Sequence, residues 1–178
     1  IFGLMEKFNL IKPDIVIGSS GSTGTLAYYV AGQYNSIKNI WENLLSTDEF
    51  ISFSRFKKII DIDYLIDNIF KKQDKLDTDA IYQSKINFLI GATNVLDGSV
   101  SYFSNRSKDD IFEALRASSA MPLVYGKRVV INNKEYIDGA IAANVFQNIK
   151  KARKLGATKI IVIKNINKNY FGDLLLKF

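Results

Sequence analysis

A turn rich in serine and glycine is the first stretch of the chain with the residue types for nucleophilic chemistry. Residues 17–25 read IGSSGSTGT and continue the apolar run at 14–18. Three glycines within seven positions permit a tight turn, because glycine lacks the Cβ that crowds the backbone elsewhere. Such a turn can bind a phosphate through its N–H groups, present a reactive serine, or serve only as a flexible loop.

The two common phosphate-binding motifs do not match this turn. A P-loop has four residues between its glycines and then Lys and Ser or Thr. Here five residues separate Gly18 from Gly24, and Thr25 follows without a lysine. The dinucleotide motif G-x-G-x-x-G also fails, because Gly21 has the wrong spacing from the other two. A phosphate-binding module, using the turn as an anion nest, is therefore the less favoured alternative.

A nucleophile elbow fits the turn better. This motif reads G-x-S-x-G and lies between a strand and a helix, as the flanking apolar segments predict here. The frame centred on Ser20 has Gly18 before it and Ser22 at the position where glycine is usual. A second frame centres on Ser22. The frame on Ser20 is preferred, because Ser20 lies two residues after Gly18, the glycine that closes the strand. Elbow geometry makes the Gly21 N–H a candidate donor to an oxyanion.

A serine nucleophile needs a base, and the composition restricts which residue can supply it. The chain contains neither histidine nor cysteine, which excludes a Ser-His-Asp triad, thiol nucleophiles and disulfides. A carboxylate must then accept the proton, and Asp138 is the candidate because it directly follows an apolar strand. Gly139 next to it permits a close backbone approach. The Asp-Gly pair is also a common turn sequence, so the residues alone leave both interpretations open.

Length and composition indicate one globular domain. The chain has 178 residues, of which 47% are hydrophobic, and its apolar runs are shorter than the ~18 residues of a membrane-spanning helix. The net charge of +6 is typical of a solvated lysine-rich surface, with attraction to anionic lipid as the functional alternative. We expect no nucleic-acid partner, because no aromatic RNA-binding motif accompanies the lysines. We also expect no metal or cofactor, and the oligomeric state is not predicted.

The hydrophobic pattern predicts alternating strands and helices. Expected strands lie at 14–18, 86–90, 100–103, 129–131, 135–137 and 159–163, and expected helices at 2–10, 26–31, 36–45, 109–118 and 145–155. Ser36 is predicted to cap the third of these helices, and Ser107 or the Lys108–Asp109 pair to cap the fourth. Residues 50–85 are expected to form either a lid or part of the core. Together the elements predict a mixed sheet with helices on both faces and two inserted hairpins.

Four segments, taken in order, resemble the patatin-like phospholipases. They are residues 12–21 (KPDIVIGSSG), residues 92–103 with Asp97-Gly98, residues 114–122 (ALRASSAMP) and residues 136–140 (YIDGA). Each motif is short, whereas their order and spacing together are specific and extend over nearly the whole chain.

The resemblance implies both a fold and an activity. The fold is a three-layer α/β/α arrangement around a central, mostly parallel sheet with inserted hairpins. The activity is hydrolysis of lipid acyl esters, of phospholipase A type, by a Ser-Asp dyad without a cofactor. Ser20 would be the nucleophile and Asp138 the general base, and the substrate would be presented by a lipid or membrane surface. A catalytically inactive lipid-binding module with the same fold is the main alternative.

The chain also departs from the family pattern. Ser22 replaces a glycine, and of the Asn-Asn-x-Pro that often follows the D-G-A motif only Asn144 remains. The family's glycine-rich oxyanion loop precedes the first helix, and this chain begins inside that helix. We therefore expect residues 1–178 to be a single patatin-like catalytic domain truncated at both ends, and a weak catalyst, since losing one oxyanion donor costs about 10²–10³ in rate. A cytoplasmic location is expected, with secretion or peripheral membrane attachment left open.

Overall fold

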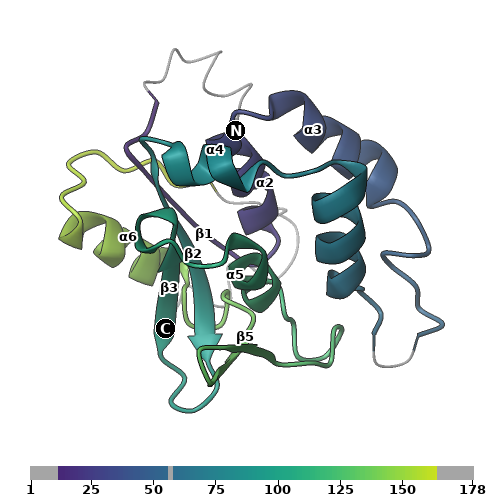
Figure 1. Cartoon of the computed structure of the whole chain (residues 1–178). Helices are drawn as coiled ribbons and strands as arrows, with labels where there is room; N and C mark the ends of the chain where they lie inside the picture. Colours follow the sequence, from purple (N-terminus) through teal and green to yellow (C-terminus); the bar gives the residue numbers. More distant parts are fainter. Residues whose placement is uncertain (1–11, 56–57, 164–178) are drawn as a thin grey trace, which may run out of the picture.

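The computed structural model describes residues 12–55 and 58–163, in which helices surround a mixed β-sheet (Figure 1). Within these residues the sheet has five strands, in the order β1-β2-β5-β4 with β3 also paired to β2. The strands are β1 (Ile15–Ser19), β2 (Asn87–Asn94), β3 (Val100–Ser104), β4 (Val129–Ile131) and β5 (Lys134–Ile137). The α/β class expected from the sequence is confirmed.

The expectation of a mostly parallel sheet is wrong for the described residues. Only β1 and β2 pair in parallel, whereas the pairs β2–β3, β2–β5 and β4–β5 are antiparallel. For the pairs β2–β3 and β4–β5 the reason is the length of the connections. Short turns at Asp97-Gly98 and at Asn132-Asn133 can join only antiparallel strands, while β1 reaches β2 through a long helical crossover. Both asparagines of the second turn have positive φ, as does Gly98, which suits tight hairpins.

One edge of β2 is shared by two strands that meet end to end. β1 pairs with β2 from Asn87 to Gly91, and β5 takes over at Thr93 and Asn94. Because β1 is parallel and β5 antiparallel to β2, their carboxyl ends approach each other between Gly91 and Thr93. The residues that follow β1 and β5 are therefore brought together, although they lie far apart in the sequence.

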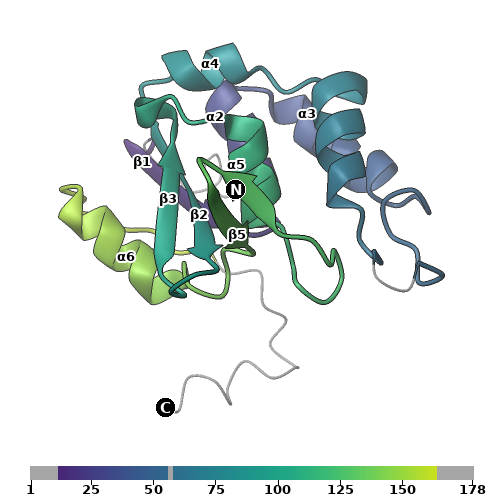
Figure 2. The ribbon, with the colours of Figure 1, turned by 60° about the horizontal axis from the view of Figure 1, so that its bottom comes forward.

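Helices cover both faces of the sheet, as the three-layer expectation requires. Figure 2 shows α6 (Val145–Lys154) on one side and α2 (Ser22–Ala31) with α5 (Ile111–Ser118) on the other. The remaining helical segments are α3 (Tyr34–Asn39), η1 (Ile40–Leu44), η2 (Tyr64–Gln73), α4 (Thr78–Gln83) and η3 (Asn105–Ser107). Gly32 and Gly156 adopt positive φ just beyond α2 and α6, as is usual where a helix ends.

Several predicted boundaries differ from the structure. The helix expected to start at Ser36 begins at Tyr34, so Ser36 is not its cap. The α5 cap is Asp110, whose Oδ1 accepts the Glu113 N–H at 3.1 Å, and not one of the residues 107–109. The apolar run at 159–163 forms no strand, because no strand of the described chain pairs with it. The expected helix at 2–10 lies outside the described residues.

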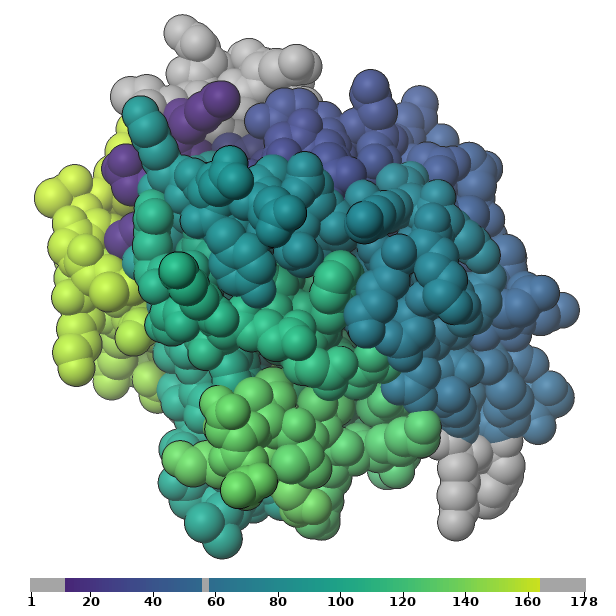
Figure 3. Space-filling model, viewed as in Figure 1, coloured from purple at the N-terminus to yellow at the C-terminus, as the bar shows by residue number. Residues whose placement is uncertain are grey.

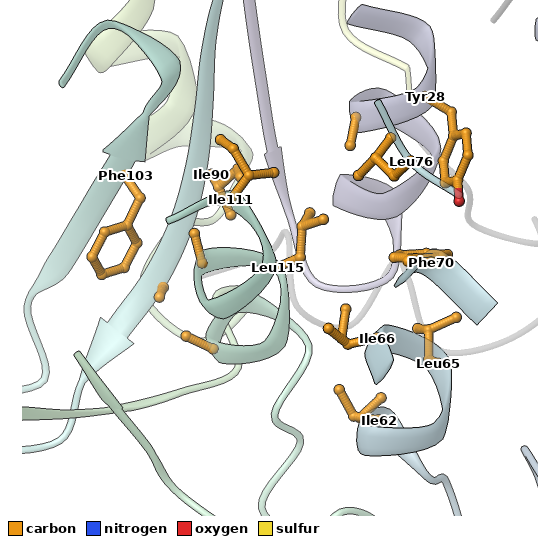
Figure 4. Close-up of a cluster of buried hydrophobic side chains, with 14 of the residues drawn as sticks. Tyr28, Ile62, Leu65, Ile66, Phe70, Leu76, Ile90, Phe103, Ile111 and Leu115 are labelled. Carbon is orange, nitrogen blue, oxygen red and sulfur yellow. The ribbon is translucent and has the colours of Figure 1, made fainter. Parts of the chain in front are cut away.

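The main core lies between α2, α5 and η2. Figure 4 shows Tyr28 of α2, Leu115 of α5, and Ile66 and Phe70 of η2 pointing toward one another. Part of the 50–85 segment is therefore core. Burying side chains of this size stabilises a fold by about 1.5–3 kcal/mol each. Within the described residues, no helix combines the length and apolarity needed to cross a membrane.

Candidate active site

Ser20 occupies a sharp turn between β1 and α2. Its φ is +57°, in the left-handed region that residues other than glycine seldom adopt. Gly18 before it leaves room for Leu26, because a Cβ at position 18 would lie 2.5 Å from a terminal methyl of that side chain. The turn is closed by Thr23, whose N–H and hydroxyl both donate to the Ser20 carbonyl, at 2.9 and 2.7 Å. This strained strand-to-helix turn has the geometry of a nucleophile elbow.

Ser22 fits the turn where the motif usually has glycine. The side chain is exposed, and its hydroxyl donates a 2.8 Å hydrogen bond to the Ser19 carbonyl. The crowding expected from a side chain here is avoided because that side chain points to solvent. The alternative frame centred on Ser22 receives no support, since this hydroxyl is bonded to the backbone of its own turn.

The structure brings Ser20 and Asp138 into direct contact. The Ser20 hydroxyl donates to Asp138 Oδ2 at 2.7 Å, and Oδ1 of the same carboxyl accepts the Ala140 N–H at 2.8 Å. Asp138 is only 3% exposed. Burial raises its pKa above the ordinary aspartate value, although the hydrogen bonds from Ser20 and Ala140 act in the opposite direction. The carboxyl is thus a stronger base than an exposed aspartate and is already aligned with a hydroxyl proton.

Ser118 joins the three segments that hold this pair. Its hydroxyl donates to the Gly91 carbonyl of β2 at 2.6 Å and accepts the Ser20 N–H at 2.9 Å. Its carbonyl accepts the Gly139 N–H at 2.9 Å. Ser118 is fully buried, so these bonds are shielded from water. Sequence reasoning missed this role and registered Ser118 only as part of the ALRASSAMP segment; its run of small residues was the available signal.

The loop after β5 packs directly on β2. A Cβ at Gly139 would lie 1.9 Å from the Gly91 carbonyl oxygen, so the expected close backbone approach is confirmed. The Thr93 hydroxyl donates to the Asp138 carbonyl at 2.7 Å and accepts the Ala142 N–H at 3.1 Å. Asp138 is therefore fixed through its backbone as well as its carboxyl.

An apolar cavity of about 150 Å³ opens beside Ser20. Its walls come from α2, the segment 37–45, the segment 50–66 and the end of α5, and include Tyr28, Trp41, Phe50, Ile66, Phe70 and Met121. A hydroxyl nucleophile at the edge of an apolar cavity can react with a group whose attached chain is hydrocarbon. The 50–85 segment thus contributes both core and cavity wall.

An ion-pair cluster ties this wall to α5. The buried Arg116 guanidinium contacts Asp63 at 2.7 Å and Asp67 at 2.8 Å. Asp63 also binds the Lys127 ammonium at 2.7 Å and accepts the Tyr125 hydroxyl at 2.5 Å. Burial acts to raise the pKa of Asp63, but the hydrogen bonds from Lys127, Tyr125 and Lys58 outweigh it and hold the pKa well below the ordinary value. Asp63 therefore stays charged across the physiological range.

The remaining expectation concerns the oxyanion donor and cofactors. Gly21 directly precedes the first residue of α2, so its N–H lies at the amino end of that helix, where anions are stabilised. Its role as an oxyanion donor stays a prediction. Across the part of the chain that the structure describes, no group of three or more His, Cys, Asp or Glu residues could hold a metal ion.

Together the layered fold and the contact between an elbow serine and a buried aspartate define the class of protein, an α/β protein with a candidate Ser-Asp dyad. The chain belongs to the patatin-like phospholipase family, whose family model matches residues 3–148. It is also 26% identical over 158 residues to the uncharacterized protein YjjU of Escherichia coli (strain K12). That match covers 86% of this chain but 43% of the relative, so the chain spans less than half the relative's length.

Proposed function

We propose that this protein is a lipid acyl hydrolase, a phospholipase A-type esterase that acts through an acyl-enzyme on Ser20. The observation that carries the proposal is the 2.7 Å hydrogen bond from the elbow Ser20 hydroxyl to the buried Asp138 carboxylate. Family membership supports lipid hydrolysis in general, and the apolar cavity beside Ser20 supports an acyl group as the part of the substrate that is bound.

The reaction begins with proton transfer within the dyad. Asp138 Oδ2 accepts the proton of the Ser20 hydroxyl while Oγ attacks the ester carbonyl carbon. The tetrahedral intermediate collapses, the carbon–oxygen bond to the alcohol breaks, and the leaving oxygen takes the proton from Asp138. Water then attacks the acyl-enzyme with Asp138 again as the base, and the carboxylic acid leaves with Ser20 restored.

The negative charge that develops on the carbonyl oxygen requires hydrogen-bond donors. We propose that the Gly21 N–H and the amino end of α2 stabilise it. The Ser20 N–H is not available for this, because it already donates to Ser118. In this proposal Gly21 stabilises the oxyanion through its backbone N–H. Side-chain substitutions at this position therefore do not test its contribution directly.

The cavity sets the size of the acyl portion that enters it. An apolar cavity of this volume is large enough for a benzene-sized ligand. The part of the acyl chain nearest the ester carbon would fill it, and a longer tail would extend past Trp41 and Met121 toward the surface. Soluble esters with short acyl chains are accordingly suitable substrates for a first assay.

Hydrolysis of p-nitrophenyl butyrate by matched serine variants tests the proposal. We expect Ser20→Ala to lose at least ~10³-fold in kcat/KM, since no other hydroxyl of the described residues donates to the Asp138 carboxylate. Ser22→Ala is the control, because this exposed serine lies in the same turn and its hydroxyl donates to the Ser19 carbonyl rather than to Asp138. Turnover by Ser20→Ala equal to that of the wild type would overturn the proposal and favour the inactive lipid-binding alternative.

A further inference from the structure

Of the described residues, four with a side-chain hydroxyl line the cavity, and they are Ser20, Thr25, Tyr28 and Ser119. Three of these hydroxyls have a hydrogen-bond partner. Ser20 donates to Asp138. Thr25 accepts the indole N–H of Trp41 at 2.9 Å. Tyr28 donates to the backbone carbonyl of Asp74. The fourth hydroxyl, on Ser119, has no partner in the part of the chain that the structure describes.

The Ser119 hydroxyl is buried without being sealed off. Ser119 is 8% exposed. Among the described residues, Arg55 Nε is the one fully enclosed side-chain nitrogen or oxygen that lacks a hydrogen bond. The Ser119 hydroxyl therefore has an open side, and the cavity that this residue lines is the space it can reach.

An unpaired hydroxyl in apolar surroundings favours a ligand with a polar atom. A buried donor without an acceptor is unfavourable, so a ligand that brings an acceptor oxygen to Ser119 gains a hydrogen bond there. An acyl ester carries two such oxygens. Its carbonyl oxygen is bonded to the carbon that Ser20 would attack, so a donor on this oxygen also orients the reacting carbon.

The backbone at Ser119 is fixed relative to Ser20. The Ser119 N–H donates to the Leu115 carbonyl at 3.1 Å, and the Ser119 carbonyl accepts the Met121 N–H at 2.9 Å. The preceding residue, Ser118, accepts the Ser20 N–H at 2.9 Å. Figure 3 shows α5 lying against η2, where the ion pairs of Arg116 join the two helices. The hydroxyl is thus presented from a rigid segment on the same cavity as the nucleophile.

We propose that the Ser119 hydroxyl is a substrate-binding group that donates a hydrogen bond to the carbonyl oxygen of an acyl ester in the cavity. When Ser20 attacks, this oxygen gains negative charge and the hydrogen bond strengthens, so Ser119 acts with the Gly21 N–H on the oxyanion. The Ser119 proton stays on Ser119 throughout. The choice of an ester as ligand rests on the proposed function, but binding of the ester does not require catalysis.

Ligand binding to a chain that carries Ser20→Ala tests this site separately from catalysis. Trp41 is the single tryptophan of the chain and lines the cavity, so its fluorescence reports an occupied cavity. The probes are ethyl butyrate and butyl ethyl ether, which has the same chain without the carbonyl oxygen. Adding Ser119→Ala is expected to weaken binding of the ester by about 5-fold, the usual strength of one hydrogen bond, and to leave binding of the ether unchanged.

Ser104→Ala provides the matched control. Ser104 is 7% exposed, does not line the cavity, and its hydroxyl donates to the Asn87 side chain at 3.0 Å. Its loss is expected to lower the melting temperature and to leave binding of both probes unchanged. Ser119→Ala should not lower the melting temperature, because its hydroxyl has no hydrogen bond to lose. Equal weakening of ester and ether by Ser119→Ala, unchanged binding of the ester, or no binding of the ester at all would overturn the proposal.

Steady-state kinetics connect the site to the proposed function. In the chain that retains Ser20, Ser119→Ala is expected to lower kcat on p-nitrophenyl butyrate by about 10²-fold and to raise KM by no more than about 5-fold, since the hydrogen bond is strongest in the transition state. An unchanged kcat would overturn the proposal while the proposed function stands. If Ser20-dependent turnover is absent but binding of the ester depends on Ser119, the binding site stands and the proposed function fails.

Discussion

The two sides of the candidate active site are held together by different interactions. The dyad region, meaning residues 18–23, 91–93, 118–120 and 138–143, is joined by hydrogen bonds among backbone groups and small side chains. The cavity wall, meaning residues 34–55 and 58–73, is held by apolar packing and by the ion pairs around Asp63. In the dyad region a single added Cβ at Gly139 has no space, whereas in the wall the contacts are between long side chains.

This contrast indicates how each side responds to change. The Ser20–Asp138 distance depends on backbone positions that close contacts and hydrogen bonds through Ser118 and Gly139 hold, so we expect small alterations near Ser118 to affect chemistry more than stability. Alterations in the wall affect stability and the fit of the acyl chain, and leave the dyad intact. The predictions below separate these two responses, in order of decreasing expected effect.

Asp138→Asn is expected to have the largest effect on activity. Asparagine can keep the contacts with Ser20 and Ala140 but cannot accept a proton, so kcat/KM on a soluble ester should fall by at least ~10⁴-fold. Steady-state kinetics with p-nitrophenyl butyrate measure this. Activity within 10-fold of the wild type would show that another group acts as the base.

The same substitution is expected to leave stability at neutral pH unchanged or higher. Because the folded-state pKa of Asp138 is raised, the folded state loses stability as pH rises through that pKa and the carboxyl ionises. Asparagine removes this loss. A clear decrease in melting temperature at pH 7 would contradict the assignment of burial as the main cause of the raised pKa.

Ser118→Ala is expected to lower kcat by about 10²-fold with a small change in KM. Alanine removes the acceptor for the Ser20 N–H and the donor to Gly91, so the strained elbow loses its fixed position relative to Asp138. Ser104→Ala is the control, because Ser104 is also buried and accepts the Arg106 N–H, at the opposite end of β2. Equal losses of kcat in the two variants would show that Ser118 acts only through general stability.

Arg116→Met tests the cavity wall. We expect a loss of about 2–3 kcal/mol in unfolding free energy, because Asp63 and Asp67 lose their buried partner while keeping exposed lysines. Arg128→Met is the control, since its ion pair with Glu135 is exposed and contributes at most about 1 kcal/mol. Urea unfolding measures both. A loss no larger than that of the control would show that packing alone holds the wall to α5.

The smallest predicted effect on activity is a shift of the acid limb of the pH profile. The base must be ionised, and the pKa of Asp138 is raised by burial, so kcat/KM should fall as pH decreases through a midpoint above the ordinary aspartate value of about 3.9. The soluble ester does not titrate in this range, so the profile reports the enzyme. A midpoint at or below the ordinary value would contradict the buried base.

The parts of the fold that were predictable from sequence are those set by local turn chemistry. Asp97-Gly98 and Asn132-Asn133 specify tight hairpins because their backbones tolerate positive φ, and both hairpins are present. The alternation of apolar runs likewise predicted β1, β2 and α6. The position of Ser20 after a buried strand followed from the same local pattern.

The remaining features depend on contacts between distant residues, which local patterns do not encode. The Ser118 hydroxyl meets the Ser20 N–H across 98 positions of sequence, and the run of small residues around Ser118 does not identify this partner. The end-to-end meeting of β1 and β5 on one edge of β2 was also hidden, and it is what brings Asp138 to Ser20. The run at 159–163 has the composition of a strand, but a strand also requires a partner.

Covalent labelling with a fluorophosphonate tests the central claim most directly, because it reports an activated serine without requiring turnover. The adduct is measured by intact mass, and its position by peptide mapping, in the wild type and in Ser20→Ala, Ser22→Ala and Asp138→Asn. The account predicts one adduct per chain on Ser20, absent from Ser20→Ala, retained in Ser22→Ala and strongly slowed in Asp138→Asn. Labelling that persists in Ser20→Ala, or a wild-type chain that does not react, would contradict it.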